Sequence, residues 1–428
     1  MKRAFPKNLR IACVCFLIIL SCTPSGKKST DAYSGGDKPV AEDAETIKIG
    51  LVGPFSGIFK YVAIYFYEVI EFAVQEQNGK GGLLGRKIEI IREDSELRAD
   101  VAARKAEKLI LEKKVNFITA IEGSHGTIAL NRLATQYRTI FINFLGSADR
   151  IQGKEFSRYA FRVGANNYTQ TSTLARFMAT KPFRKYYIIS PDYDYGHDLA
   201  NAFKKQIKQY IPDVQIVGED YHLLGTRNYD FFINRIKAAG ADAVFSGSFA
   251  SDLGQLVRQS RSQGLKAPFP FVTPGEPLLG EFPRKEDGVG IYSTAGYSML
   301  VDTTENKAWI AKYHNQHKFD SLWKKWPAAD AGAIIFGWQM VFASAEKAGS
   351  LDPEKIIAAF EGFRFKTPVG WWYMRECDHQ VILPMFGMAT KAGPNPYYPF
   401  PWYGPDYVTF SAEETAIPAT RDYNPRCP

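Results

Sequence analysis

Histidine and cysteine are scarce in this sequence, and the motifs that carry most enzyme chemistry are missing from it. The 428 residues include 6 histidines and 5 cysteines. The histidines are scattered, so no His/Cys group has the spacing of a metal site. There is also no Gly-x-Ser-x-Gly elbow and no phosphate-binding loop. These absences disfavour a hydrolase or a dehydrogenase, and we expect no catalytic residue, cofactor or metal.

Long apolar runs are also missing, apart from a short one near the N-terminus. Residues 11–20 are apolar and follow the basic residues Lys2, Arg3, Lys7 and Arg10. A run of about ten residues is roughly half of what a membrane-spanning helix needs. A basic flank before a short apolar core is typical of a secretory signal. We therefore expect the protein to be exported, without a permanent transmembrane anchor.

A cysteine stands directly after the apolar run. The stretch Ile19-Leu20-Ser21-Cys22 resembles a bacterial lipobox. This resemblance implies that residues 1–21 are removed and that Cys22 becomes a lipidated N-terminus. The alternative is a plain signal peptide in which Cys22 is incidental. Residues 22–45 are rich in Ser, Gly, Lys and Asp, which indicates a flexible tether.

The net charge of the chain after the signal is small. Of the net charge of +8, four positive charges lie before Cys22, so the rest of the chain carries about +4. We therefore expect no binding to nucleic acid.

Once Cys13 and Cys15 leave with the signal, only Cys377 and Cys427 remain as thiols. In an oxidising compartment this pair favours one disulfide that holds the C-terminal tail. Two free thiols are the alternative.

Short β-branched runs alternate with amphipathic stretches from Ile47 onward. Strand patterns are found at 47–52, 87–91, 115–120 and 139–143, and helical patterns near 61–77, 102–110 and 127–138. The same order repeats with strands at 185–189, 214–217, 243–246 and 270–272 and helices near 196–210, 228–239 and 252–263. Repeated strand–helix–strand units require right-handed crossovers and a mostly parallel sheet. The sequence therefore predicts an α/β fold of two doubly wound parallel-sheet lobes.

The last helical stretches lack strands of their own. They lie near 303–317, 330–347 and 353–361, and we place them on the first lobe. The chain then crosses between the lobes three times, and such a three-segment hinge opens and closes as a unit. The predicted N-terminal lobe is 46–164 plus 295–365. The predicted C-terminal lobe with its tail is 165–294 plus 366–428.

Loops that follow the predicted strands have the composition of a ligand site. Ligands bind beyond the carboxyl ends of strands in open parallel sheets. In the first lobe, Ser124 and Ser147 lie in such loops beside glycines, where N–H and O–H donors suit a carboxylate. The alternative for Ser124 is helix capping.

The matching loops of the second lobe carry other chemistry. Tyr195 and Phe249 are aromatic, and Glu276 supplies a carboxylate. We call the hydroxyl-bearing loops around Ser124 and Ser147 the anion seat, because they could bind a ligand carboxylate. An acidic residue opposite this anion seat would suit a zwitterion such as an amino acid, because each buried charge needs a partner. The alternative for Tyr195 is packing on the lobe surface.

Several motifs together carry a resemblance to a known family. They are IKIG at 47–50 with PFSG at 54–57, NGKGGLLG at 78–85, DYDYG at 192–196, and GQLVRQ at 254–259 with GL at 264–265. From about Ile47 to Ala389 the chain resembles the leucine/isoleucine/valine-binding family of type I periplasmic binding proteins of ABC importers. The resemblance implies a monomer that binds a small molecule between two lobes and delivers it to permease subunits.

The resemblance also assigns roles to positions of this sequence. The ligand-carboxylate contacts fall on Ser124, Leu145 and Ser147. The aromatic contacts fall on Tyr61, Tyr195 and Phe249, and the acid that meets the ligand ammonium falls on Gly275 or Glu276.

Three departures from the family pattern bear on which ligand is bound. Phe249 lacks the hydroxyl usual at its position, Glu122 adds a charge beside the seat, and the acid Glu276 comes one place late.

The sequence as a whole predicts an exported solute-binding lipoprotein, held by lipid to the cell membrane and facing the periplasm or the cell exterior. Its expected ligand is a branched-chain amino acid or a similar small amino acid, amide or carboxylate. A ligand-sensing lipoprotein of the same fold, acting on a partner receptor, is the alternative; an α/β hydrolytic enzyme is disfavoured. We interpret Asp378-His379-Gln380 as a turn between two C-terminal strands.

Overall fold

The structure, a computed structural model, describes residues 45–272, 285–316, 325–391 and 402–428. The predicted signal, Cys22 and Glu276 lie outside these ranges, so their predicted roles have no structural counterpart here. None of the helices in these ranges combines the length and the apolar character that a bilayer crossing requires.

Five parallel strands form the sheet of the first lobe. Their order is β2-β1-β3-β4-β5. The central strands β3 and β4 are buried at every position, which is why apolar and polar residues do not alternate along them. The bounds are β1 Ile47–Gly53, β2 Ile88–Asp94, β3 Phe117–Ala120, β4 Ile140–Asn143 and β5 Ala160–Arg162.

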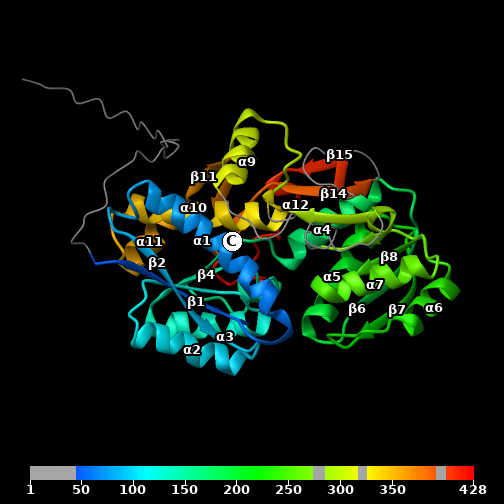
Figure 1. Cartoon of the computed structure of the whole chain (residues 1–428), viewed down its shortest axis with the longest axis horizontal. Helices are drawn as coiled ribbons and strands as arrows, with labels where there is room; N and C mark the ends of the chain where they lie inside the picture. Colours follow the sequence, from blue (N-terminus) through cyan, green and yellow to red (C-terminus); the bar gives the residue numbers. More distant parts are fainter. Residues whose placement is uncertain (1–44, 273–284, 317–324, 392–401) are drawn as a thin grey trace, which may run out of the picture. The chain divides into compact units, whose positions relative to one another are not determined.

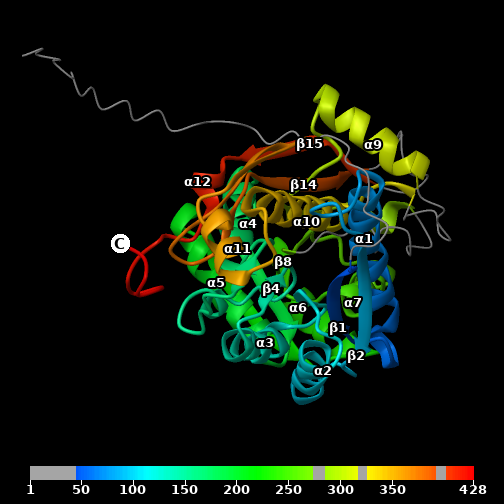
Figure 2. The ribbon, with the colours of Figure 1, turned by 90° about the vertical axis from the view of Figure 1, so that its left-hand side faces the viewer.

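Helices cover both faces of this sheet. α2 and α3 pack together on one face, while α1 packs against α10 on the other (Figures 1 and 2). α9 contributes Trp309, Ile310 and Tyr313 to the same core. The bounds are α1 Lys60–Gly79, α2 Ala99–Leu111, α3 Ser124–Tyr137, α9 Thr304–Gln316, α10 Ala329–Ala348 and α11 Pro353–Phe360. The late helices α9, α10 and α11 thus all contribute side chains to the core of the first sheet.

The second lobe contains one parallel sheet and one mixed sheet. The parallel sheet has the order β7-β6-β8, and a bridge from Ser246 to Phe271 connects it to the sheet β15-β14-β10-β9. β14 runs antiparallel to both β10 and β15, so this part of the lobe departs from the purely parallel pattern. The bounds are β6 Lys185–Pro191, β7 Gln215–His222, β8 Ala243–Ser246, β9 Phe269–Pro270, β10 Ile291–Ala295, β14 Met385–Lys391 and β15 Trp402–Phe410.

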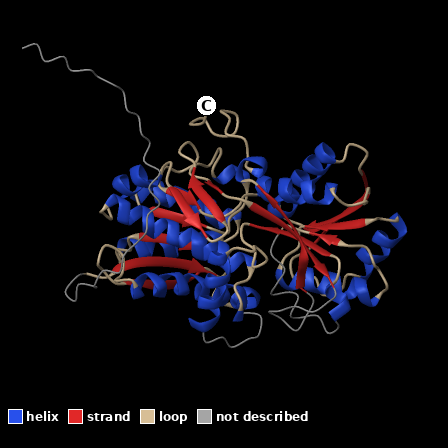
Figure 3. Cartoon of the chain, turned by 90° about the horizontal axis from the view of Figure 1, so that it is seen from above, coloured by secondary structure: helices blue, strands red, loops and turns tan. Residues whose placement is uncertain are grey.

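Helices also flank the strands of the second lobe (Figure 3). α4 begins at an N-cap, Asn166, whose side chain accepts a hydrogen bond from the Thr169 N–H, and α6 ends at Gly240, which has φ +61°. The bounds are α4 Asn167–Ala179, α5 Asp194–Tyr210, α6 Asp230–Ala239, α7 Ala250–Ser262 and α12 Ala412–Thr415.

The C-terminal boundary of the first lobe differs from the prediction, which assigned residues 366–428 to the second lobe. β11 Arg364–Thr367, β12 Gly370–Met374 and β13 Val381–Ile382 form a separate antiparallel sheet. Its buried side chains Trp372 and Met374 belong to the core of the first sheet, because they face α10 and its neighbours. The next strand, β14, pairs with β10 and β15 in the mixed sheet of the second lobe.

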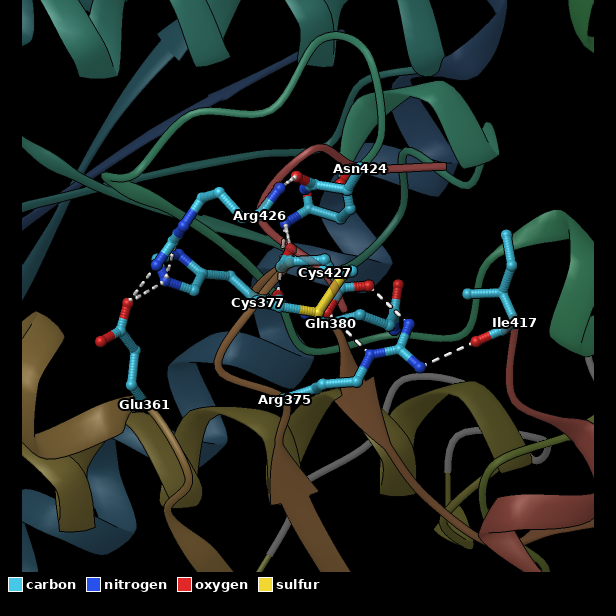
Figure 4. Close-up of a disulfide and its surroundings, with 11 residues drawn as sticks. Glu361, Arg375, Cys377, Gln380, Ile417, Asn424, Arg426 and Cys427 are labelled. Carbon is cyan, nitrogen blue, oxygen red and sulfur yellow. Dashed lines mark hydrogen bonds and ion pairs between the residues drawn. A yellow bond between two sulfur atoms is a disulfide. The ribbon is translucent and has the colours of Figure 1, made fainter. Parts of the chain in front are cut away.

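The C-terminal tail returns to the first lobe after α12. Asn424 donates its side-chain N–H to the carbonyl of Gln152 at 2.7 Å, and Arg426 pairs with Glu361 at 2.9 Å. Cys377 and Cys427 form the disulfide that the sequence favoured over two free thiols (Figure 4). Asp378–Gln380 lies in the turn between β12 and β13, as interpreted from the sequence.

Candidate functional site

Two hydroxyl-bearing loops meet at the carboxyl end of the first sheet. Ser124 is the first residue of α3, directly after β3, and Ser147 follows β4. The Ser124 hydroxyl accepts a hydrogen bond from the Ala148 N–H at 3.2 Å, which ties the two loops together. The N-cap of α3 is Gly123, which has no side chain to cap the helix. The alternative role of Ser124 as an N-cap is therefore wrong.

The loop that carries Leu145 and Ser147 is shaped by Asn143. The Asn143 side chain accepts hydrogen bonds from the N–H groups of Leu145 and Gly146 and donates to the Gly146 carbonyl. A Cβ atom on Gly146 would lie 2.2 Å from the Thr127 hydroxyl, so only glycine lets this loop approach α3 so closely. Asn143 was not predicted as a site residue, although an asparagine that ends a strand is a common turn signal.

A buried arginine supports this loop from below. Arg162 has no exposed surface, and its guanidinium donates to the carbonyl of Ala148 at 2.7 Å. The carboxylates of Asp149 and Asp378 lie close enough to favour its charge. A buried charge needs such partners, and this one fixes the backbone beside Ser147.

The aromatic residues of the second lobe also come together. Tyr195 lies in the first turn of α5, and its ring contacts Phe249 edge-on at 5.9 Å and Tyr193 at 5.8 Å. Burial raises the pKa of the Tyr195 hydroxyl, which therefore stays protonated. Tyr195 also packs at the edge of the core formed by β6 and α5, so part of its ring serves the lobe as the alternative interpretation held.

The loop that carries Phe249 is held by a buried histidine. His222 Nε2 lies 2.7 Å from the Ser248 hydroxyl, and its Nδ1 lies 2.9 Å from the Leu223 carbonyl. Burial lowers the pKa of His222, so the ring is neutral near pH 7. Asp252 is 4.0 Å from Nδ1, but both Ser248 and His222 are almost fully buried. His222, Ser248 and Asp252 therefore hold the loop that carries Phe249, and a substrate cannot reach them.

Side chains of the two lobes touch at this level. The Phe59 and Phe249 rings stack at 6.1 Å, and the Tyr61 hydroxyl accepts a hydrogen bond from the Ser251 N–H at 3.2 Å. Next to Ser124, His125 Nε2 lies 3.0 Å from the Asp194 carboxylate beside Tyr195. The loops of both lobes thus meet at these three contacts.

Charged residues beside these contacts were not recognised from the sequence. Arg150 reaches Asp194 at 3.4 Å, which gives the Asp194 carboxylate a second cation from the first lobe. All three partners are substantially exposed, so the pairing is weak in water. Phe59 was missed as well, because a lone aromatic in a glycine-containing loop has no distinguishing pattern.

Glu122 lies two residues before Ser124 and is buried to all but 3 % of its surface. Burial raises the pKa of its carboxyl to about 7, against a hydrogen bond from Ser95 that lowers it. The nearby charge of Asp94 raises it further. Across the ranges that the structure describes, no three His, Cys, Asp or Glu side chains gather in a way that could hold a metal ion.

The chain matches the family model described as periplasmic binding protein over residues 46–394. It is 25% identical over 363 residues to Leu/Ile/Val-binding protein homolog 4 of Brucella melitensis, covering 80% of this chain and 83% of that protein. These matches bear out the resemblance drawn from the sequence motifs.

Solved structures share the fold. A leucine-, isoleucine-, valine-, threonine- and alanine-binding protein from Brucella ovis, in its closed conformation, superposes with a TM-score of 0.76 at 22% identity, covering 90% of this chain and 99% of that one. A solute-binding protein of an ABC transporter from Rhodopseudomonas palustris, in complex with 3,4-dihydroxybenzoic acid, superposes with a TM-score of 0.73 at 23% identity. The match covers 86% of this chain and 98% of that one. The relatives are named as binding proteins and not as enzymes. With its two-lobed α/β fold and a family match across most of its length, this chain belongs to the periplasmic binding protein family.

Proposed function

We propose that this protein is the solute-binding lipoprotein of an ABC importer, and that it closes its two lobes around a small carboxylate or amino acid and delivers it to the permease. The convergence of the site loops carries the proposal. Ser124 and Ser147 are tied together in the first lobe, and Phe249 and Ser251 of the second lobe reach Phe59 and Tyr61 of the first.

The polar groups of the first lobe suit an anion. The N-terminus of α3 presents backbone N–H groups, and its N-cap residue, Gly123, has no side chain that could cap them. The Ser124 hydroxyl uses its oxygen as an acceptor toward Ala148, so its own hydrogen can be donated to a ligand carboxylate. The partial positive charge of the helix terminus favours the same charge on the ligand.

The aromatic groups of the second lobe suit the rest of the ligand. Tyr195 and Phe249 offer an apolar surface that faces Phe59 across the lobes. Relatives in this family are named for branched-chain amino acids, and one solved neighbour holds a hydroxylated benzoic acid. Both ligand types have a carboxylate at one end and an apolar body, and we propose that the ligand here does too.

Closure follows from differential binding. A ligand that touches both lobes stabilises the closed arrangement, and only this arrangement docks on the permease.

A thermal-shift screen of residues 23–428 against amino acids, amides and aromatic acids tests the proposal. Because a ligand that binds only the folded state raises its melting temperature, at least one class is expected to give a shift. A flat response from all three classes would reject the proposed ligand chemistry.

Removing one polar and one aromatic contact tests the site residues. We expect Ser124→Ala to weaken binding of the best ligand about tenfold, the value of one hydrogen bond to a charged group. Tyr195→Ala is expected to weaken it about tenfold or more, since a buried aromatic contact is lost. Titration calorimetry measures both. Thr180→Ala at the end of α4, away from the site, is the control. Unchanged affinity in both site variants, with intact circular dichroism, would remove these residues from the site.

The lipid anchor and the transport role need their own tests. We propose that Cys22 is the lipidated N-terminus, which predicts that full-length protein partitions with membranes and that Cys22→Ser releases it.

A ligand-sensing lipoprotein is the second candidate, because the lobes and the site are the same in both roles. Uptake of the identified ligand in cells that lack this protein distinguishes them, since a pure sensor leaves uptake intact.

A further inference from the structure

Glu122 is a buried acidic side chain within the candidate anion seat. It follows β3 and precedes Ser124 by two residues, so the same loop carries both. A Cβ atom on Gly126 would lie 2.7 Å from Glu122 Oε2, which shows that the carboxyl lies over the first turn of α3. A glycine at 126 makes room for it.

The Ser95 hydroxyl, which follows β2, lies near this carboxyl and favours its charged form. One of the two carboxyl oxygens, Oε1, is buried and makes no hydrogen bond to any residue that the structure describes. Leaving a buried polar atom without a partner costs about 1–3 kcal/mol, and more when the atom is charged.

The position of the carboxyl points to the ligand as the missing partner. Ser95 is itself hydrogen-bonded to the Gly53 carbonyl at the end of β1, so Glu122 lies above the carboxyl ends of β1 and β2. This is the edge at which ligands bind in open parallel sheets. Ser124 and the Leu145–Ser147 loop border the same edge.

We propose that Glu122 is a specificity-determining residue, and that its free oxygen accepts a hydrogen bond from an N–H or O–H group that the ligand carries in addition to its carboxylate. This inference rests on the proposed function and narrows its ligand class. The ligand is a small acid with a second donor, such as a hydroxyl or amino substituent, and an aliphatic acid without such a substituent leaves the carboxyl of Glu122 unpaired.

The charged groups around Glu122 set the expected pH dependence. Asp94 faces it from the end of β2, and His125 on α3 is turned toward Asp194. Since the pKa of Glu122 is raised to about 7, the carboxyl is partly protonated near neutrality. A ligand donor needs the carboxylate form, so affinity should rise with pH up to about 7 and fall toward tenfold per pH unit below it. A protonated Glu122 that donates to the ligand carboxylate predicts the opposite slope.

Matched pairs of probes test the assignment. 3-Methylbutanoate and valine differ by the amino group alone, and benzoate and 4-hydroxybenzoate differ by one hydroxyl. Calorimetry from pH 5.5 to 8.5 on wild type should give an affinity about tenfold higher for the donor-bearing member of the pair that binds. In Glu122→Leu this preference should vanish or invert, and in Glu122→Gln it should be reduced and lose its pH slope.

The outcomes separate this inference from the proposed function. Glu89→Gln, an exposed glutamate at the other end of the sheet, is the control and should behave as wild type. Equal affinities within the pair, or affinity that rises as pH falls, would overturn the role of Glu122 while the proposed function stands. Failure of all four probes to bind folded wild type would reject the proposed ligand class and this assignment together. Should Glu122→Leu not fold, the Glu122→Gln variant and the wild-type pH series still decide the question.

Discussion

Replacing both Cys377 and Cys427 by serine is expected to lower the free energy of unfolding by about 4 kcal/mol. The disulfide closes a loop with a sequence separation of 50 residues, and cross-linking a loop of this length removes that much entropy from the unfolded chain. The loop includes β13, β14 and β15, so it spans the last passage between the lobes. Urea unfolding of residues 23–428, with and without a reductant, measures this loss of unfolding free energy.

The same experiment contains its control. Reductant should destabilise wild type to the level of the double-serine variant and leave that variant unchanged. The tail is also held by Asn424 on Gln152 and by Arg426 on Glu361, so the folded tail should persist after reduction. A loss below about 1 kcal/mol would mean that these contacts, and not the disulfide, hold the tail.

Asp378→Ala is expected to cost about 3–5 kcal/mol of stability, because it leaves a buried guanidinium without its partner. The Arg375 side chain is 14% exposed and binds both oxygens of the fully buried Asp378, at 2.9 and 2.5 Å. Its remaining nitrogen donates to the Ile417 carbonyl, so it cannot swing to water without breaking the tail (Figure 4). Chemical unfolding measures the loss.

Two further variants define the cause. Asp100 pairs with Arg98 and Arg104 at the surface, so Asp100→Ala should cost far less stability than Asp378→Ala. The double variant Arg375→Met with Asp378→Leu should recover much of the loss, since it removes the lone charge together with its partner. Equal costs for Asp378→Ala and Asp100→Ala would show that water reaches Arg375.

The sequence predicted the fold well where one face or the whole of an element is buried. The strands at 47–52 and 139–143 and the helix at 330–347 match β1, β4 and α10 to within one or two residues, because burial imposes a period that the residues must follow. Prediction was poorer at 270–272, where β9 is Phe269–Pro270, since so short a strand depends on its neighbours in the sheet.

The candidate site was predicted in part. Loop positions such as Ser124, Ser147 and Phe249 follow from the strand ends and the family resemblance. Asn143, Arg162 and His222 could not be found this way, because their function is to hold a loop and depends on partners distant in sequence. Glu122 was noticed as a departure, but its unpaired oxygen is a property of the packed structure.

The amino-acid sequence by itself determined the α/β class, the two repeats of strand and helix, and the edge of the sheets at which the site loops lie. These features are encoded by local periodicity and by turn residues, which act over a few positions. Only the tertiary structure decided that residues 366–383 pack on the first lobe, that the tail is fastened there, and that Phe59 and Tyr61 meet Phe249 and Ser251. These are contacts between segments far apart in the chain, and only the packed core decides which segments meet.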